Sequence, residues 1–122
     1  MSLEGLIRGR IEAVEQAFKD KDLEKFLSHY APNAVIVDAK QNKLFVGTEA
    51  ITGLFKEWAT FGSFTNKNTN ETFEGSEQLI RYSATSTITF EGGKTFVTNF
   101  IQYWRKVDGK YVVETDVFDI VN

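Results

Sequence analysis

Apolar residues recur every three or four positions in three stretches of the first half of the chain, which is the spacing of amphipathic helices. The first stretch begins at Leu3. The second ends before Pro32, because proline disfavours helical geometry at the preceding residue, and the third follows Gly47. The apolar positions of the three predicted helices are Leu3, Leu6, Ile7, Ile11, Val14, Ala17 and Phe18, then Leu23, Phe26, Leu27 and Tyr30, and finally Ile51, Leu54, Phe55 and Trp58.

The rest of the chain has the composition of β-strands. Residues 34–38 and 44–46 are rich in β-branched and apolar side chains and predict a small hairpin between the second and third helices. Residues 63–75 are polar, yet alternate in a way that fits one wet face of a strand, and residues 78–90 predict a clearer strand. Asp108-Gly109 joins the runs 96–107 and 110–121, which is the strongest short-range signal for a hairpin.

Both faces of the run 96–107 carry large apolar groups. Phe96, Phe100 and Trp104 share one face, and Val97 and Ile101 lie on the other. In a strand with one face exposed to solvent, apolar and polar residues alternate regularly, which they do not here. We therefore expect one face of this sheet to pack against the helices and the other to be partly covered by another chain. The pattern predicts one α+β domain over residues 1–122, with helices on one face of a curved antiparallel sheet.

Composition excludes several classes of function. The chain has 122 residues, which suffices for one hydrophobic core, and it has no cysteine and one histidine, so thiolate chemistry and a metal site are not expected. A net charge of -3 with dispersed basic residues disfavours nucleic-acid binding. No apolar run is long enough to span a membrane, and the first residues lack a secretion signal, so we expect a cytoplasmic protein with no membrane partner.

The order of these elements resembles the cone-shaped fold of the nuclear transport factor 2 (NTF2)-like superfamily. That superfamily includes SnoaL-like polyketide cyclases, ketosteroid isomerase, scytalone dehydratase and the association domain of calcium/calmodulin-dependent kinase II. Residues 102–111 and 115–118 resemble the closing hairpin of the group of stand-alone domains that are similar to this association domain. The resemblance implies three N-terminal helices on the concave face of the sheet and a pocket inside the cone.

A second resemblance concerns residues 30–38, which are similar to the segment of ketosteroid isomerase that ends in its catalytic Asp. It implies that Asp38 is a general base. The other groups of that site do not carry over, because its oxyanion Tyr falls at or near Val14 and residues 96–104 contain no Asp. The alternative is that Asp38 is a turn carboxylate that faces water.

Further candidates follow from strand alternation and from the predicted pocket. Asp116 alternates with Val112, Glu114, Phe118 and Ile120, and it is a second candidate acid or base; the alternative is a structural, hydrogen-bonded Asp. Tyr30 is the candidate phenolic donor, and His29 beside it is expected to face solvent. The expected ligand-binding residues are Trp58, Phe100, Gln102, Trp104 and Phe118.

Two functions are compatible with these residues. The first is an enzyme that needs no cofactor and catalyses isomerisation, dehydration or cyclisation of a small molecule in an apolar pocket, with Asp38 as general base. The second is a non-catalytic module that binds a ligand or forms a homodimer through the convex face of the sheet. Fold alone does not choose between them.

Overall fold

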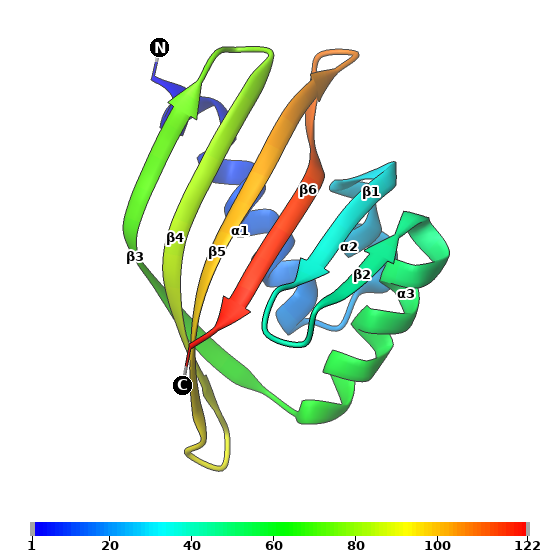
Figure 1. The fold of residues 1–122 in the computed structure, drawn as a ribbon, viewed down its shortest axis with the longest axis vertical. Helices are drawn as coiled ribbons and strands as arrows, with labels where there is room; N and C mark the ends of the chain where they lie inside the picture. Colours follow the sequence, from blue (N-terminus) through cyan, green and yellow to red (C-terminus); the bar gives the residue numbers. More distant parts are fainter. Residues whose placement is uncertain (1, 122) are drawn as a thin grey trace.

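A computed structural model describes residues 2–121 and contains three helices packed against one curved six-stranded sheet (Figure 1). The helices are α1 (Leu3–Lys19), α2 (Leu23–Ser28) and α3 (Gly47–Trp58), and α3 continues into a short 3₁₀ turn, Ala59–Phe61. The strands are β1 (Tyr30–Asp38), β2 (Lys43–Val46), β3 (Phe64–Gly75), β4 (Leu79–Phe90), β5 (Thr95–Val107) and β6 (Lys110–Ile120). The α+β prediction is confirmed, including β3, the polar strand.

The strands lie in the order β2-β1-β6-β5-β4-β3. Neighbouring strands are antiparallel except for β1 and β6, which pair in parallel, with Ile36 opposite Asp116 and Asp38 opposite Phe118. The sheet is therefore mixed and not purely antiparallel as the sequence pattern predicted. The difference arises because a strand from the first third of the chain pairs with the final strand, and short-range patterns carry no information about such a pairing.

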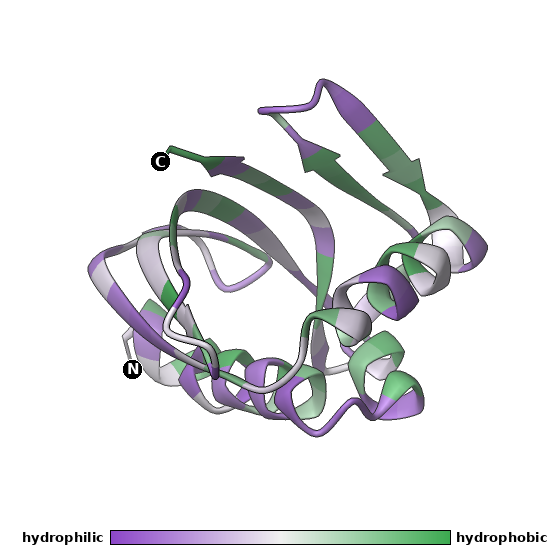
Figure 2. Cartoon of the chain, turned by 90° about the horizontal axis from the view of Figure 1, so that it is seen from below, coloured by the Kyte–Doolittle hydropathy of each residue, from purple (hydrophilic) through white to green (hydrophobic). Residues whose placement is uncertain are grey.

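The helices cover the concave side of the sheet, and the apolar core lies between the two layers (Figure 2). Ile7 and Ile11 of α1 are buried against the sheet, where Ile80, Trp104 and Val113 are completely buried. The helical spacing of the first stretch therefore marks the buried face of α1 correctly. These side chains form part of the apolar core between the helices and the sheet.

The hairpin between β5 and β6 forms as predicted. Asp108 and Gly109 both adopt positive φ, 51° and 78°, which is the backbone of the tight turn that suits twisted antiparallel strands. Farther along the hairpin the register shifts, because Tyr103 pairs with Thr115 while Trp104 pairs with Val113.

The register shift leaves Glu114 as an extra residue in β6, which makes it a β-bulge. The bulge reverses the side-chain alternation, so that Tyr111 and Val113 are buried before it and Asp116 is buried after it. The prediction that Val112 and Glu114 share the face of Asp116 is therefore wrong. Glu114 instead forms an ion pair with Arg105, whose side chain is exposed.

The connection from α2 to β1 also differs from the prediction. β1 begins at Tyr30, so Tyr30 is the first residue of a strand and not the end of the second helix. His29 caps α2, and its carbonyl oxygen accepts a hydrogen bond from the backbone N of Val113 at 2.8 Å. His29 is buried, with 8% of its surface exposed, and not solvent-facing as predicted. Burial lowers its pKa to about 4.

Gly75 occupies a position that we expect to tolerate only glycine. Its φ is +117°, and a Cβ there would lie 2.3 Å from the carbonyl oxygen of Leu79. Gly75→Ala is expected to lower the free energy of unfolding by on the order of 2 kcal/mol. The matched control is Gly53→Ala in α3, where a Cβ would meet nothing within 4 Å and where Ala is expected to stabilise by about 1 kcal/mol. Urea denaturation followed by circular dichroism measures both, and equal midpoints would contradict the assignment.

The described residues contain neither a membrane-spanning helix nor a cluster of metal-binding side chains. Between residues 2 and 121 no helix is sufficiently long and apolar to cross a membrane. Within the same range no group of three or more His, Asp or Glu side chains is arranged to hold a metal ion.

Candidate functional site

A cavity of about 260 Å³ lies between the helices and the concave face of the sheet. Its wall is predominantly apolar and aromatic, and its polar groups come from α1, β1 and strands β3 to β6. The lining residues are Val14, Glu15, Phe18, Phe26, Tyr30, Trp58, Phe61, Phe64, Asn66, Ser86, Ile88, Phe90, Phe96, Thr98, Phe100, Gln102, Asp116, Phe118 and Ile120.

Asp116 is the centre of a hydrogen-bonded group in this cavity. Its Oδ2 atom accepts hydrogen bonds from the hydroxyl of Tyr30 at 3.0 Å and from the Gln102 amide at 3.2 Å. The Gln102 oxygen in turn accepts a hydrogen bond from the indole Nε1 of Trp104 at 3.1 Å, which orients the amide. Both of these hydrogen bonds to the Asp116 side chain end on the same carboxylate oxygen.

The surroundings of this group change its proton affinity. Burial raises the pKa of Asp116 to about 6, and the hydrogen bonds from Gln102 and Tyr30 oppose this rise because they favour the ionised carboxylate. Burial also raises the pKa of Tyr30 well above its ordinary value, and the neighbouring carboxylate raises it further. Tyr30 is therefore a neutral hydrogen-bond donor at neutral pH, and the raised pKa of Asp116 lies closer to neutral pH than that of an ordinary Asp.

Aromatic rings make up the wall around the polar group. The Trp58 ring lies 5.4 Å from that of Phe118 in an edge-to-face arrangement and 5.5 Å from that of Phe18, measured between ring centroids. Phe100 packs edge-to-face against Tyr82 at 5.5 Å. Trp58 is half-buried, which is expected for a residue that forms part of a cavity wall.

Six of the eight side chains selected from the sequence line this cavity, namely Asp116, Tyr30, Trp58, Phe100, Gln102 and Phe118. The other two, Trp104 and Asp38, do not. Trp104 is completely buried in the core, and its indole donates a hydrogen bond to Gln102, which lines the cavity.

Asp38 lies on the interior side of β1 together with Ala34 and Ile36, and only 5% of its surface is exposed, so it is not the water-facing carboxylate of the alternative interpretation. Its Oδ1 atom accepts a hydrogen bond from the backbone N of Gln41 at 3.1 Å, which stabilises the turn between β1 and β2. Of the two candidate catalytic carboxylates, Asp116 lines the cavity and Asp38 does not. The role of Asp38 as a general base stays a prediction without support from this geometry.

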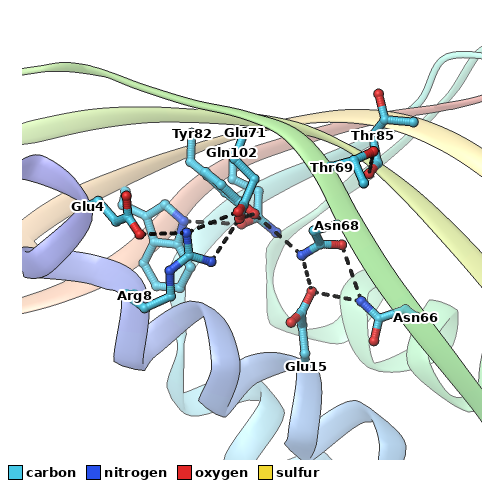
Figure 3. Close-up of polar contacts among 11 residues, drawn as sticks. Glu4, Arg8, Glu15, Asn66, Asn68, Thr69, Glu71, Tyr82, Thr85 and Gln102 are labelled. Carbon is cyan, nitrogen blue, oxygen red and sulfur yellow. Dashed lines mark hydrogen bonds and ion pairs between the residues drawn. The ribbon is translucent and has the colours of Figure 1, made fainter.

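A second carboxylate, which was not among the predicted site residues, also lines the cavity. Glu15 projects from α1, and its Oε2 atom accepts hydrogen bonds from the amides of Asn68 at 2.7 Å and Asn66 at 3.1 Å (Figure 3). Both Asn residues alternate along β3, so the polar strand supplies donors to the interior of the cone. The spacing of two residues between Asn66 and Asn68 was the feature of the sequence that could have indicated that both side chains lie on one face of the strand.

Arg8 forms ion pairs with two other carboxylates, Glu4 and Glu71. Its guanidinium donates to Glu71 at 2.8 and 3.1 Å and to Glu4 at 3.0 Å, and Tyr82 donates its hydroxyl to Glu71 at 2.6 Å (Figure 3). The hydrogen bond from Arg8 lowers the pKa of Glu71, so this pair is ionic. The Asn68 amide contacts the Tyr82 hydroxyl at 3.4 Å and joins this network to Glu15.

Comparison with known proteins places this fold in a family. The sequence profile of the SnoaL-like domain matches residues 11–114, which is most of the chain. The chain belongs to the SnoaL-like domain family. No curated protein sequence matches this SnoaL-like domain.

Solved structures share the fold of this SnoaL-like domain at low sequence identity. An NTF2-like protein of unknown function from Pseudomonas putida superposes with a TM-score of 0.85 at 21% identity, over 95% of this chain and 84% of that one. A candidate calcium/calmodulin-dependent protein kinase II association domain from Xanthomonas campestris gives 0.83 at 17%, over 94% and 85%. A ketosteroid isomerase-like protein from Erwinia carotovora atroseptica gives 0.77 at 13%, over 97% and 95%. The expected membership of the NTF2-like superfamily is confirmed.

Proposed function

We propose that this SnoaL-like domain binds a small, largely apolar molecule in its cavity and transfers a proton to or from it through Asp116. The observation that carries the proposal is the buried Asp116 carboxylate, which lines an aromatic cavity. Burial raises the pKa of this carboxyl to about 6, and one of its oxygens accepts hydrogen bonds from the hydroxyl of Tyr30 and the amide of Gln102. A base with a pKa near the working pH combines a large ionised fraction with useful proton affinity.

The reaction class follows from the groups at hand. Asp116 removes a proton from a carbon next to an electron-withdrawing group. In an isomerisation it returns this proton to another carbon, in a dehydration it gives it to the leaving hydroxyl, which departs as water, and in a cyclisation it gives it to the oxygen of the carbonyl group that the new carbanion attacks. Tyr30 and Gln102 hold the carboxylate in place, and the aromatic wall excludes water, which strengthens electrostatic interactions in the cavity. These steps use only side chains of this chain, so the proposal requires no cofactor.

Nitrobenzisoxazole tests the proposal, because removal of its ring C–H proton by a base breaks the N–O bond and releases a coloured phenolate. The protein is expected to catalyse this ring opening with saturation, and the rate is expected to rise with pH through a midpoint near 6 and then level off, since the ionised carboxylate is the base. A stopped-flow or plate absorbance assay from pH 4 to pH 9 gives the profile.

Tyr30→Phe provides the control for the assignment of the midpoint. The Tyr30 hydroxyl favours the ionised form of Asp116, so its removal is expected to move the midpoint to higher pH. A rate that is linear in probe concentration, or a midpoint that does not move in Tyr30→Phe, would contradict proton transfer by Asp116.

The expected homodimer through the convex face stays a proposal beside this function. On β5, Val97, Ile101 and Tyr103 are each partly exposed on that face. Apolar side chains on an open sheet face favour pairing with a second copy. This arrangement is compatible with either a catalytic or a purely binding role of the cavity.

A further inference from the structure

The cavity has an unbalanced charge. Two carboxylates, Glu15 and Asp116, line it, and no Lys, Arg or His is among the described residues that do so. The two groups project from different elements, α1 and β6. A bound anion would therefore bring a further negative charge to a wall that already carries carboxylates, whereas a cation would offset them.

The geometry of Glu15 leaves a hydrogen-bond acceptor for a ligand. Both Asn66 and Asn68 donate to Oε2, and Figure 3 shows their two dashed contacts meeting on one oxygen while the other has none. The two amides fix the orientation of the carboxylate. Oε1 therefore remains an acceptor on a positioned carboxylate in the cavity wall.

Arg8, the basic side chain of α1 that takes part in the polar network, pairs with carboxylates other than Glu15. Arg8 is bound by Glu71 at 2.8 Å and by Glu4 at 3.0 Å, so its charge is matched by two other carboxylates. The contacts that Glu15 makes through its side chain are with neutral amides. A ligand that carries a positive charge would supply the missing partner.

The aromatic wall favours the same kind of ligand. Ten of the lining residues are aromatic, and the faces of Trp, Tyr and Phe rings attract cations through their negative electrostatic potential. The group includes Phe18 and Phe64, whose ring centroids lie 5.2 Å apart, and which belong to the same elements as Glu15 and Asn66. Apolar and cationic recognition are thus available together at this part of the wall.

We propose that the ligand of the cavity is an apolar amine whose protonated nitrogen donates to Oε1 of Glu15 while its hydrocarbon part packs among the aromatic rings. This inference rests on the proposed function, because it names the substrate class of the same cavity. It assigns Glu15 as the residue that determines specificity and leaves proton transfer to Asp116.

A matched set of three probes tests the inference: phenylbutylamine, phenylbutanol and phenylbutanoate share one scaffold and differ in charge. Binding to the full chain is measured at neutral pH by titration of tryptophan fluorescence, since Trp58 lines the cavity, and by calorimetry. The wild-type protein is expected to bind the amine about tenfold more tightly than the alcohol, which corresponds to about 1.4 kcal/mol, and the acid most weakly.

Variants on α1 assign the preference to one carboxylate. Glu15→Gln is expected to remove most of the tenfold ratio between amine and alcohol. Glu12→Gln makes the same change of charge at an exposed position of α1 that does not line the cavity, and it is expected to keep the ratio. The ratio of amine to alcohol affinity in the wild-type protein tests the inference even if a variant does not fold. Circular dichroism shows whether the two variants are folded.

The outcomes separate this inference from the proposed function. If the alcohol binds as well as the amine in the wild-type protein, or if Glu12→Gln lowers the affinity ratio as much as Glu15→Gln does, the assignment of an amine ligand is wrong. The role of Asp116 is then decided separately by the ring-opening assay. If none of the three probes binds and no ring opening occurs, the cavity is not a binding site and both proposals fail.

Discussion

Replacement of Asp116 by Asn is expected to slow the ring opening of nitrobenzisoxazole about 10²- to 10⁴-fold, which is the usual contribution of a positioned general base. Asn is nearly the same size as Asp, and its side-chain oxygen can still accept the hydroxyl of Tyr30, so the cavity is expected to keep its shape. The loss would therefore come from the missing carboxylate. Initial rates at a pH well above 6 measure it.

Asp119→Asn is the matched control for this variant. Asp119 lies on the same strand and is exposed, and it does not line the cavity, so the same chemical change is expected to leave the rate unaltered. If Asp116→Asn retains more than half of the rate, the base lies elsewhere. Asp38→Asn and Glu15→Gln would then identify which of the other buried or cavity carboxylates acts.

The stability of the wild-type protein is expected to fall as the pH rises through about 6, and Asp116→Asn is expected to remove this loss. The pKa of Asp116 is raised from 3.8 to about 6 in the folded state, so the folded protein binds this proton more tightly than the unfolded chain does. The contribution to stability is full below pH 3.8 and is lost as the pH rises through about 6. The difference in pKa corresponds to about 3 kcal/mol.

Urea denaturation at pH 4, 5, 6, 7 and 8 measures this linkage. The variant changes hydrogen bonds as well as charge, and that part of its effect is the same at every pH; the dependence of the difference on pH is therefore the diagnostic quantity. Titration of the buried His29, with a pKa of about 4, occurs in both proteins and cancels in the difference. A difference that does not change between pH 4 and pH 8 would mean that Asp116 has an ordinary pKa.

Much of the fold follows from local sequence patterns. The 3–4 spacing of Ile7, Ile11 and Val14 identifies the buried face of α1, and Asp108-Gly109 identifies the last turn. Two features did not follow. The parallel pairing of β1 with β6 and the bulge at Glu114 depend on how distant strands meet, and neither leaves a periodic signal in the chain.

The candidate site could be predicted only in part, because some of its residues follow from local patterns and others depend on contacts between distant elements. Asp116 was selected through an alternation that the bulge interrupts. It lines the cavity together with Phe118 and Ile120, whereas Val112 and Glu114, which precede the end of the bulge, do not. Asp38 was selected from a resemblance. In the structure its carboxylate accepts a hydrogen bond from the backbone N–H of Gln41 in the turn between β1 and β2. Glu15 was passed over because its helical spacing places it beside the apolar stripe, and only the donors on β3 show that it faces the cavity.

The position of β6 has a consequence for how the protein forms. β6 follows every other described element in the sequence, yet it lies between β1 and β5 in the sheet. Until β6 is available, β1 with β2 and β3 with β4 and β5 are two separate pieces with open edges, and the hydrogen bond between Tyr30 and Asp116 joins residues 86 positions apart. Such distant pairings are slow to form. The cavity is therefore complete only when β6 has paired with both β1 and β5, and a chain in which β6 is unpaired would expose the edges of these two strands to aggregation.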